Sequence, residues 1–190
     1  MKFLRTEIPD LILIEPSLIG DERGYFMETF RVDRLNEFLG FQVNFCQDNE
    51  SKSGFGVLRG LHFQLPPFSQ TKLVRVIQGK VLDVAVDIRK GSPTFGKHVA
   101  VELSGENRLQ MFVPRGFAHG FIVLSETAIF NYKVDNYYNH AADRGITFND
   151  PSLEIDWLLN FEDLKISEKD KKQPFLLEAD IFDFNSALYE

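Results

Sequence analysis

Hydrophobic and polar positions change their spacing twice along the chain. Residues 31–39, RVDRLNEFL, place their apolar side chains on one helical face and predict a short amphipathic helix. From about residue 43 to residue 148, short runs of β-branched and aromatic residues alternate with turn signals. The clearest predicted strands are KLVRVI, GKVLDVAVDI, HVAVEL, LQMFVP, GFIVL and AIFNYKV. Beyond Pro151 the pattern becomes helical and charged, and SEKDKK is a predicted helix start.

The number and spacing of these strands indicate the fold class. QGK and SGEN, each between two successive strands, are tight hairpin signals. Many short strands at regular spacing predict a sandwich or barrel, and a double-sheet jelly roll is the leading architecture. The 190 residues contain no repeat, linker or low-complexity tract. We therefore expect one mainly β domain over residues 1–190, with a few short helices that lie mostly in the C-terminal part.

Composition and charge limit the possible partners. The formal net charge of −7 and the pI of about 5.2 argue against a general nucleic-acid surface but leave room for a small anionic ligand in one basic pocket. Cys46 is the single cysteine, so no disulfide framework or cysteine metal cluster is expected. The chain has no apolar run of ~18 residues and no signal-peptide pattern at its start, so we expect a cytoplasmic protein without a membrane span. The 19 Phe and 5 Tyr are expected to pack in the core and at a subunit interface.

Residues 59–81, RGLHFQLPPFSQTKLVRVIQGKV, have the layout of a metal site that lacks part of its ligand set. His62 is followed by Gln64 and Lys72 where a second histidine and a glutamate would complete the set, and FVPRGFAHGF supplies His119. Two neutral imidazoles beside a cation make a poor site for a divalent metal. We therefore expect no metal in this pocket.

Lys72 and two aspartates are candidates for charges inside the predicted barrel. Both faces of KLVRVIQ carry apolar residues, so this strand should be covered on both sides. Lys72 then either snorkels to solvent at the strand end or places a fixed positive charge in a cavity, and the pattern leaves both open. Asp83 and Asp87 have apolar neighbours in DVAVDIR and need partners, for which Lys72, Arg89 and His119 are the candidates.

A pocket that holds histidine, lysine and tyrosine suits proton abstraction beside a carbonyl group. The histidine takes the proton, the lysine holds the enolate oxygen, and a tyrosine on the opposite face returns a proton and inverts the carbon. Tyr132, in FNYKV, is a candidate for this acid. The alternative is an ordinary strand tyrosine with its hydroxyl in water, and the sequence pattern alone favours that alternative.

With these residues, the chain closely resembles the dTDP-4-dehydrorhamnose 3,5-epimerases, a metal-free branch of the cupins. The resemblance runs from about residue 20 to residue 177. It rests on long segments in the same order, namely DERGYFMETF, QDNESKSGFGVLRGLHFQ, KLVRVIQGKVLDVAVDIRKGSPTFG, FVPRGFAHGF, YKVDNYY, DRGITFNDPSLEIDW and SEKD. It implies a cupin-type double-stranded β-helix that forms a single epimerase domain.

The resemblance implies roles for four catalytic residues. His62 would be the base that removes protons from carbons 3 and 5, which flank the 4-keto group of the sugar. Asp170 would orient the His62 ring, Tyr132 would be the acid on the other face, and Lys72 would stabilise the enolate. Asp170 has a second interpretation, because Ser167 to Asp170 also fits a capping box in which the acid only caps a helix.

The resemblance also implies a set of substrate contacts. Arg23 and Arg59 would bind the diphosphate, and further contacts would come from Glu28, Gln47, Asn49, Lys72, His119, Tyr138, Asp143 and Lys169. Of these, Glu28, Gln47 and Asn49 would contact the thymidine, Tyr138 would stack on thymine, and His119 would meet sugar or phosphate oxygens. Asp143 stands where the family usually carries glutamate, so its contact is expected to be weaker or water-mediated. The plainer interpretations are a charged turn for Arg23 and an exposed aromatic residue for Tyr138.

The implied function is inversion of carbons 3 and 5 of dTDP-4-dehydro-6-deoxy-D-glucose, which gives dTDP-4-dehydro-L-rhamnose for rhamnose biosynthesis. Three alternatives stay open: an epimerase that inverts carbon 3 alone, a non-catalytic sugar-nucleotide-binding cupin, and a metal cupin. The resemblance implies no cofactor. It also implies a homodimer in which strands are exchanged and some nucleotide contacts come from the partner chain.

Overall fold

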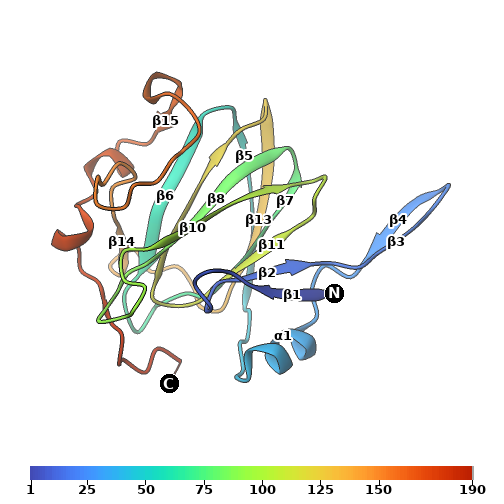
Figure 1. Cartoon of the computed structure of the whole chain (residues 1–190), viewed down its shortest axis with the longest axis horizontal. Coiled ribbons are helices and arrows are strands. Elements are labelled where there is room, and N and C mark those ends of the chain that lie inside the picture. Colours follow the sequence, from blue (N-terminus) through green and yellow to red (C-terminus); the bar gives the residue numbers. More distant parts are fainter. Residues whose placement is uncertain (190) are drawn as a thin grey trace.

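Alternating apolar residues build two facing sheets in the computed structural model, which describes residues 1–189 (Figure 1). The first sheet is six-stranded and antiparallel, with the order β1-β2-β11-β7-β13-β5. Its strands are β1 (Lys2–Arg5), β2 (Ile12–Glu15), β5 (Gln47–Gly54), β7 (Lys72–Gln78), β11 (Gln110–Val113) and β13 (Thr127–Val134).

The second sheet follows the order β10-β8-β12-β6-β14, and β15 pairs with β6 in the parallel sense. Its strands are β6 (Val57–Gln64), β8 (Lys80–Asp87), β10 (His98–Ser104), β12 (Phe117–Val123), β14 (Asp143–Gly145) and β15 (Lys165–Ile166). A short parallel pair, β9 (Arg89–Lys90) and β16 (Phe182–Asp183), ties the C-terminal segment to the end of β8. The mainly β jelly roll that the strand pattern predicts is confirmed.

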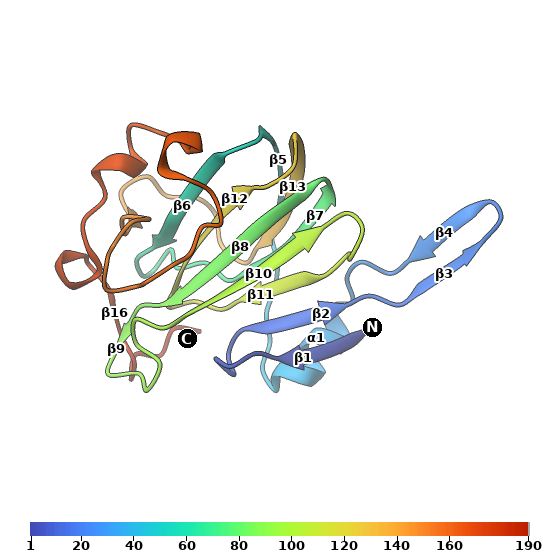
Figure 2. The same cartoon turned by 45° about the horizontal axis from the view of Figure 1, so that its top comes forward.

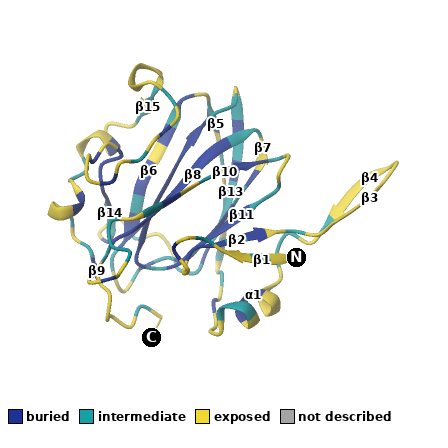
Figure 3. Ribbon diagram, viewed as in Figure 1, coloured by how far each residue is buried: buried dark blue, intermediate teal, exposed yellow. Residues whose placement is uncertain are grey.

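Most strands of the two sheets are buried, whereas β5 at the edge of the first sheet is only partly buried (Figure 3). Val74 and Phe130 belong to the apolar core between the sheets. Leu73 points the other way, into a cluster under the N-terminal segment and its helix. On the outer face of the second sheet, Val84 packs in a third cluster with Trp157 of the C-terminal segment. The prediction that KLVRVIQ is covered on both sides is thus confirmed at Leu73 and Val74 but not at Ile77, which is 43% exposed.

The predicted N-terminal helix is confirmed, whereas the helix predicted to start at SEKDKK is only a single 3-10 turn. The helix α1 (Val32–Leu39) ends at Gly40, which has a φ of 78° and is a typical left-handed C-cap. In the C-terminal part the helical elements are single 3-10 turns, η1 (Phe161–Asp163), η2 (Asp170–Lys172) and η3 (Leu176–Glu178). An α-helix has no room at η2, because β15 ends just before it and Pro174 follows just after it.

A hairpin near the N-terminus extends away from the two sheets. It consists of β3 (Leu18–Asp21) and β4 (Gly24–Met27), which pair only with each other and project from the body in both views (Figures 1 and 2). Its large side chains are exposed, with Ile19 at 70% and Phe26 at 65%. Separately, none of the helices within residues 1–189 has the length and apolar character that a membrane-spanning helix requires.

Candidate active site

A cavity of about 540 Å³ lies between the two sheets, and C-terminal residues 165–170 form part of its wall. Strands β5, β7 and β13 line it from the first sheet, and β6 and β12 line it from the second. Nine of the predicted site residues line this cavity, although they are scattered over 112 positions of the chain: Arg59, His62, Lys72, His119, Tyr132, Tyr138, Asp143, Lys169 and Asp170.

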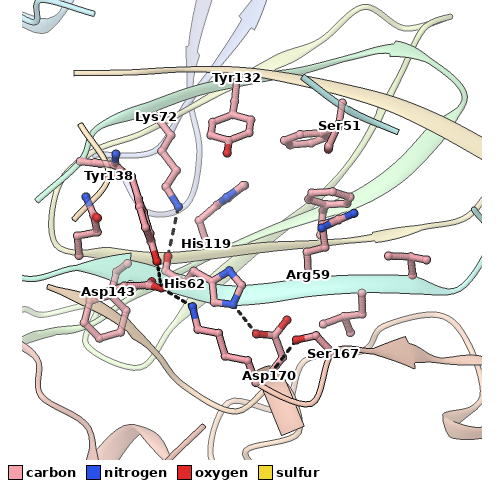
Figure 4. Close-up of a pocket in the computed structure, with 18 of the residues that line it drawn as sticks. Ser51, Arg59, His62, Lys72, His119, Tyr132, Tyr138, Asp143, Ser167 and Asp170 are labelled. Carbon is pink, nitrogen blue, oxygen red and sulfur yellow. Dashed lines mark hydrogen bonds and ion pairs between the residues drawn. The ribbon is translucent and has the colours of Figure 1, made fainter. Parts of the chain in front are cut away.

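His62 and Asp170 form a hydrogen-bonded pair in this wall (Figure 4). His62 Nε2 lies 2.6 Å from Asp170 Oδ1, and the Asp170 side chain is only 4% exposed. Burial opposes ionisation of this carboxyl, but hydrogen bonds from His62, Ser167 and the Gly60 amide outweigh burial and lower the pKa of Asp170. The Ser167 hydroxyl also accepts a hydrogen bond from the Asp170 backbone N–H at 3.1 Å. The interpretation of Asp170 as only a helix cap is therefore wrong, because its carboxylate contacts His62.

Tyr132 faces His62 from the opposite sheet. It comes from β13, whereas His62 comes from β6, and Figure 4 shows the Tyr132 hydroxyl pointing into the cavity toward the His62 side. Burial raises the pKa of the Tyr132 phenol, and the nearby charge of Arg59 opposes part of this effect. A phenol that keeps its proton and points into a cavity can donate that proton to a bound ligand.

Lys72 places a positive charge inside the cavity, so the second of its two sequence interpretations is correct. Its Nζ donates a hydrogen bond to the His62 carbonyl oxygen at 3.3 Å. Burial lowers the pKa of Lys72 from 10.5 to about 8, and the carboxylates of Asp83 and Asp143 oppose part of this shift. An ammonium held in this way can stabilise an anionic oxygen that develops beside it.

The two buried aspartates of β8 have the partners expected from the sequence. Both carboxylate oxygens of Asp83 lie 3.0 Å from His119 Nε2, so the cavity holds a second imidazole–carboxylate pair. Asp87 accepts hydrogen bonds from Arg89 at 2.7 and 2.9 Å. The two pairs differ in position, because His119 lines the cavity with Asp83 behind it, whereas Asp87 and Arg89 lie at the end of β8.

Tyr138, Asp143 and Lys169 form a cluster at the cavity rim (Figure 4). The Tyr138 hydroxyl donates a hydrogen bond to Asp143 Oδ2 at 2.9 Å, and the Lys169 ammonium pairs with the same carboxylate. This hydrogen bond raises the pKa of Tyr138. The ring itself is exposed, so it can form one face of a binding site for a planar group.

Four predicted substrate contacts lie away from the cavity of their own chain. Arg23 sits at the turn of the β3–β4 hairpin, pairs with Asp21, and has a side chain that is 86% exposed. Glu28 follows the hairpin and pairs with Arg31 at 3.3 Å. Two further residues, Gln47 and Asn49, bond to each other at 2.6 Å on β5 and do not line the cavity.

Strand β5 also supplies cavity residues that the sequence analysis missed. Ser51 lines the cavity, and Ser53 accepts a hydrogen bond from Arg59 Nε at 3.2 Å. The strand reads QDNESKSG and contains no apolar residue, so a search for apolar runs passes over it. Its signal is the period-2 alternation of small or amide side chains on one face with charged side chains on the other.

Within residues 1–189, no group of three or more histidine, cysteine, aspartate or glutamate side chains is arranged to hold a metal ion. His62 and His119 line the cavity and each bonds one carboxylate, and Lys72 enters the same cavity (Figure 4). Two imidazoles that already bond carboxylates, beside a lysine ammonium, make a poor donor set for a divalent metal.

Comparisons with known proteins agree with this geometry. The family model for dTDP-4-dehydrorhamnose 3,5-epimerase matches residues 5–178. The chain is 52% identical over 182 residues to the dTDP-4-dehydrorhamnose 3,5-epimerase of Shigella flexneri. This alignment covers 96% of this chain and 99% of that protein. A crystal structure of dTDP-6-deoxy-D-glucose-3,5-epimerase from Legionella pneumophila, in complex with dTDP-4-keto-L-rhamnose, superimposes with a TM-score of 0.93 at 48% identity and covers 97% of this chain and 99% of that one. The crystal structure of the Bacillus anthracis dTDP-4-dehydrorhamnose 3,5-epimerase, with TDP and PPi bound, gives a TM-score of 0.87 at 45% identity. The match covers 92% of this chain and 98% of that one. The chain belongs to the dTDP-4-dehydrorhamnose 3,5-epimerase family.

Proposed function

We propose that His62 and Tyr132 carry out the 3,5-epimerisation of dTDP-4-dehydro-6-deoxy-D-glucose from opposite walls of the cavity. The chain is an isomerase of dTDP-rhamnose biosynthesis by its family, and the assignment of roles to its residues is ours. One observation carries the assignment. A carboxylate-paired imidazole and a phenol enter the same cavity from two different sheets, which is what inversion of a carbon between them requires.

Each inversion is a pair of proton transfers without any change of oxidation state. His62 removes the proton from the carbon beside the 4-keto group, and the electron pair of that C–H bond becomes the enolate whose charge rests on the ketone oxygen. The Lys72 ammonium stabilises this oxygen. Tyr132 then protonates the opposite face of the same carbon, and the His62 proton returns to the tyrosinate through solvent. The sequence runs once at carbon 3 and once at carbon 5.

The second His–Asp pair and the rim cluster would bind the rest of the substrate. Arg59 faces the cavity with a guanidinium that can bind the diphosphate, and the exposed ring of Tyr138 can stack on thymine. His119, fixed by Asp83, would donate a hydrogen bond to sugar or phosphate oxygens. Lys169 would contribute positive charge at the rim while its pairing with Asp143 holds that charge in place.

The residue assignment is tested by exchange in heavy water. We expect wild-type protein to incorporate deuterium at carbons 3 and 5 of dTDP-4-keto-6-deoxyglucose, as followed by NMR. His62→Asn should abolish exchange at both carbons while dTDP still binds. Tyr132→Phe should retain exchange but lose inversion. Label at carbon 3 alone would instead indicate a single epimerase, and equal loss of exchange and inversion in Tyr132→Phe would contradict its role as the acid.

The substrate site is completed by a second chain in a homodimer, as the hairpin suggests. An isolated two-stranded hairpin with exposed Ile19 and Phe26 has too little buried surface to hold its position alone, so a partner surface would stabilise it. Arg23 and Glu28 lie on or beside this hairpin and away from their own cavity. A hairpin that reaches the partner would bring both residues to the partner's cavity.

Mixed dimers distinguish contacts made within a chain from contacts made across the dimer. Arg23→Ala and His62→Ala chains are each expected to be inactive or weak. When the two variants are unfolded and refolded together, random pairing makes half of the dimers mixed. If Arg23 acts across the dimer, each mixed dimer has one intact site and one damaged site. About a quarter of all sites is then restored. Absence of any restored activity, or a monomer by light scattering, would contradict the proposal.

A further inference from the structure

Gln64 occupies a position where a metal-binding jelly roll would carry a ligand, yet its side chain serves a different purpose. It is the last residue of β6, is 4% exposed, and lines the cavity. Its Nε2 donates hydrogen bonds to the carbonyl oxygens of Phe68 at 2.7 Å and Tyr137 at 3.2 Å. Its Oε1 accepts a hydrogen bond from the Asn139 backbone N–H at 2.6 Å. The amide therefore has both donors and its oxygen engaged with backbone groups.

Two of these bonds lie on either side of Tyr138. The amide of Gln64 bonds the carbonyl of residue 137 and the N–H of residue 139, so it acts on the backbone around Tyr138 much as a neighbouring strand would. The tip of the same tyrosine is held by Asp143 at 2.9 Å. Gln64 and Asp143 are direct partners in the β6–β14 ladder. One cross-strand pair thus fixes both the backbone and the hydroxyl of Tyr138.

This arrangement matters because little else packs around the tyrosine. Tyr138 is 58% exposed and Tyr137 is 63% exposed, so apolar burial does not fix the loop. An exposed tyrosine on an unrestrained loop would sample several positions, and a ligand would have to immobilise it on binding. Hydrogen bonds from a buried amide remove that motion before the ligand arrives.

We infer that Gln64 is a positioning residue that holds the Tyr138 ring ready for the nucleobase of the substrate. The inference rests on the proposed function, in which Tyr138 stacks on thymine. It assigns Gln64 to affinity for the dTDP part of the substrate, which is remote from the reacting carbons. Loss of the Gln64 hydrogen bonds should therefore raise KM and leave kcat nearly unchanged, because the contact with the nucleobase is present in both the ground state and the transition state.

Gln64→Met is the direct test, because methionine has nearly the same shape and no polar atoms at its end. We expect the Kd for dTDP, measured by calorimetry, to rise about tenfold, and kcat at saturating substrate to stay within about twofold. Calorimetry with dTDP needs no turnover, so it reports on the inference even if the proposed chemistry fails. Asn36→Leu is the matched control. Asn36 is another buried amide, bonded to the Val43 N–H at 3.0 Å outside the cavity, and its replacement should leave the Kd for dTDP unchanged.

A double-mutant cycle separates positioning of the ring from a general structural role. In a Tyr138→Ala background, Gln64→Met should cause no further loss of dTDP affinity, because the ring that Gln64 positions is gone. The same loss in both backgrounds would overturn the inference, as would an unchanged Kd or a fall in kcat alone. If Gln64→Met does not fold, Gln64→Glu serves instead. It keeps the acceptor for Asn139 and loses both donated bonds, so the same cycle applies.

Discussion

Replacing Lys72 with methionine should make the fold more stable while it removes catalysis. The Lys72 ammonium lies in the cavity wall, where burial lowers its pKa from 10.5 to about 8 even though Asp83 and Asp143 oppose the shift. The native state therefore holds this charge at a cost in free energy. Methionine has a similar length and no charge, so it removes the cost together with the group proposed to stabilise the enolate.

The pKa values set both the size of the effect and its pH window. A pKa that falls from 10.5 to about 8 corresponds to about 3 kcal/mol. Below pH 8 the lysine is protonated in both the folded and the unfolded state, and the full cost is present. Between pH 8 and pH 10.5 the unfolded chain still binds a proton that the folded chain has released, so wild-type stability rises with pH there. The advantage of Lys72→Met should thus reach about 3 kcal/mol at pH 7 and narrow above pH 8.

Guanidinium unfolding at pH 7, 8.5 and 10 measures this advantage, with deuterium exchange into the substrate as the activity assay. Lys52→Met is the matched control, because Lys52 lies on β5 with an exposed side chain and its loss should change neither property. A Lys72→Met protein that is less stable than wild type at pH 7 would refute the reasoning. So would an advantage that stays constant from pH 7 to pH 10.

Three further predictions follow from the contacts of single residues. Asp170→Asn keeps the shape of the carboxyl but removes the charge 2.6 Å from His62, so deuterium exchange should slow by about 10²-fold while calorimetry shows unchanged dTDP affinity. Gly120→Ala would place its Cβ 2.7 Å from the Arg59 carbonyl oxygen and 3.0 Å from Gly60 Cα, which are both backbone atoms. Thermal unfolding should therefore show that the free energy of unfolding falls by about 2 kcal/mol, and activity should fall with it. Asp87→Ala removes the buried partner of Arg89, whose side chain is only 12% exposed. Urea unfolding should show that the free energy of unfolding falls by about 3 kcal/mol, while substrate binding is retained.

The sequence indicated the parts of the site that carry an apolar pattern. Lys72, Asp83 and His119 stand among apolar residues, so the pattern raises the question of their partners, although it leaves both positions of Lys72 open. Strand β5 carries no such signal, because one of its faces borders the cavity and the other faces solvent, and both are polar. A search that depends on apolar periodicity cannot find a strand of this kind.

Asp170 marks a second limit of sequence reasoning. Ser167 to Asp170 fits a capping box, and the serine does accept the Asp170 N–H, but the Asp170 carboxylate bonds His62 instead of capping a helix. The bond to His62 joins residues 108 positions apart, and no local pattern contains that information. The same holds for Arg23, whose turn is plain in the sequence but whose position on a projecting hairpin is not. For these two residues, the contacts with distant segments were accessible only through resemblance to a family.

The two imidazole–carboxylate pairs of the cavity are similar in bonding but differ in exposure, and this difference supports the choice of base. A base that serves two carbons must exchange its proton with solvent between the two steps. The His62 side chain is 31% exposed, whereas the His119 side chain is 7% exposed and lies against the Phe130 ring with centroids 6.2 Å apart. A buried imidazole fixed by Asp83 suits a constant hydrogen bond to the ligand, and it exchanges protons with water poorly. The partner of His62 comes instead from the C-terminal segment, which leaves the other side of the ring open to the cavity. This difference in exposure supports the proposal that His62 transfers the protons and His119 binds the ligand.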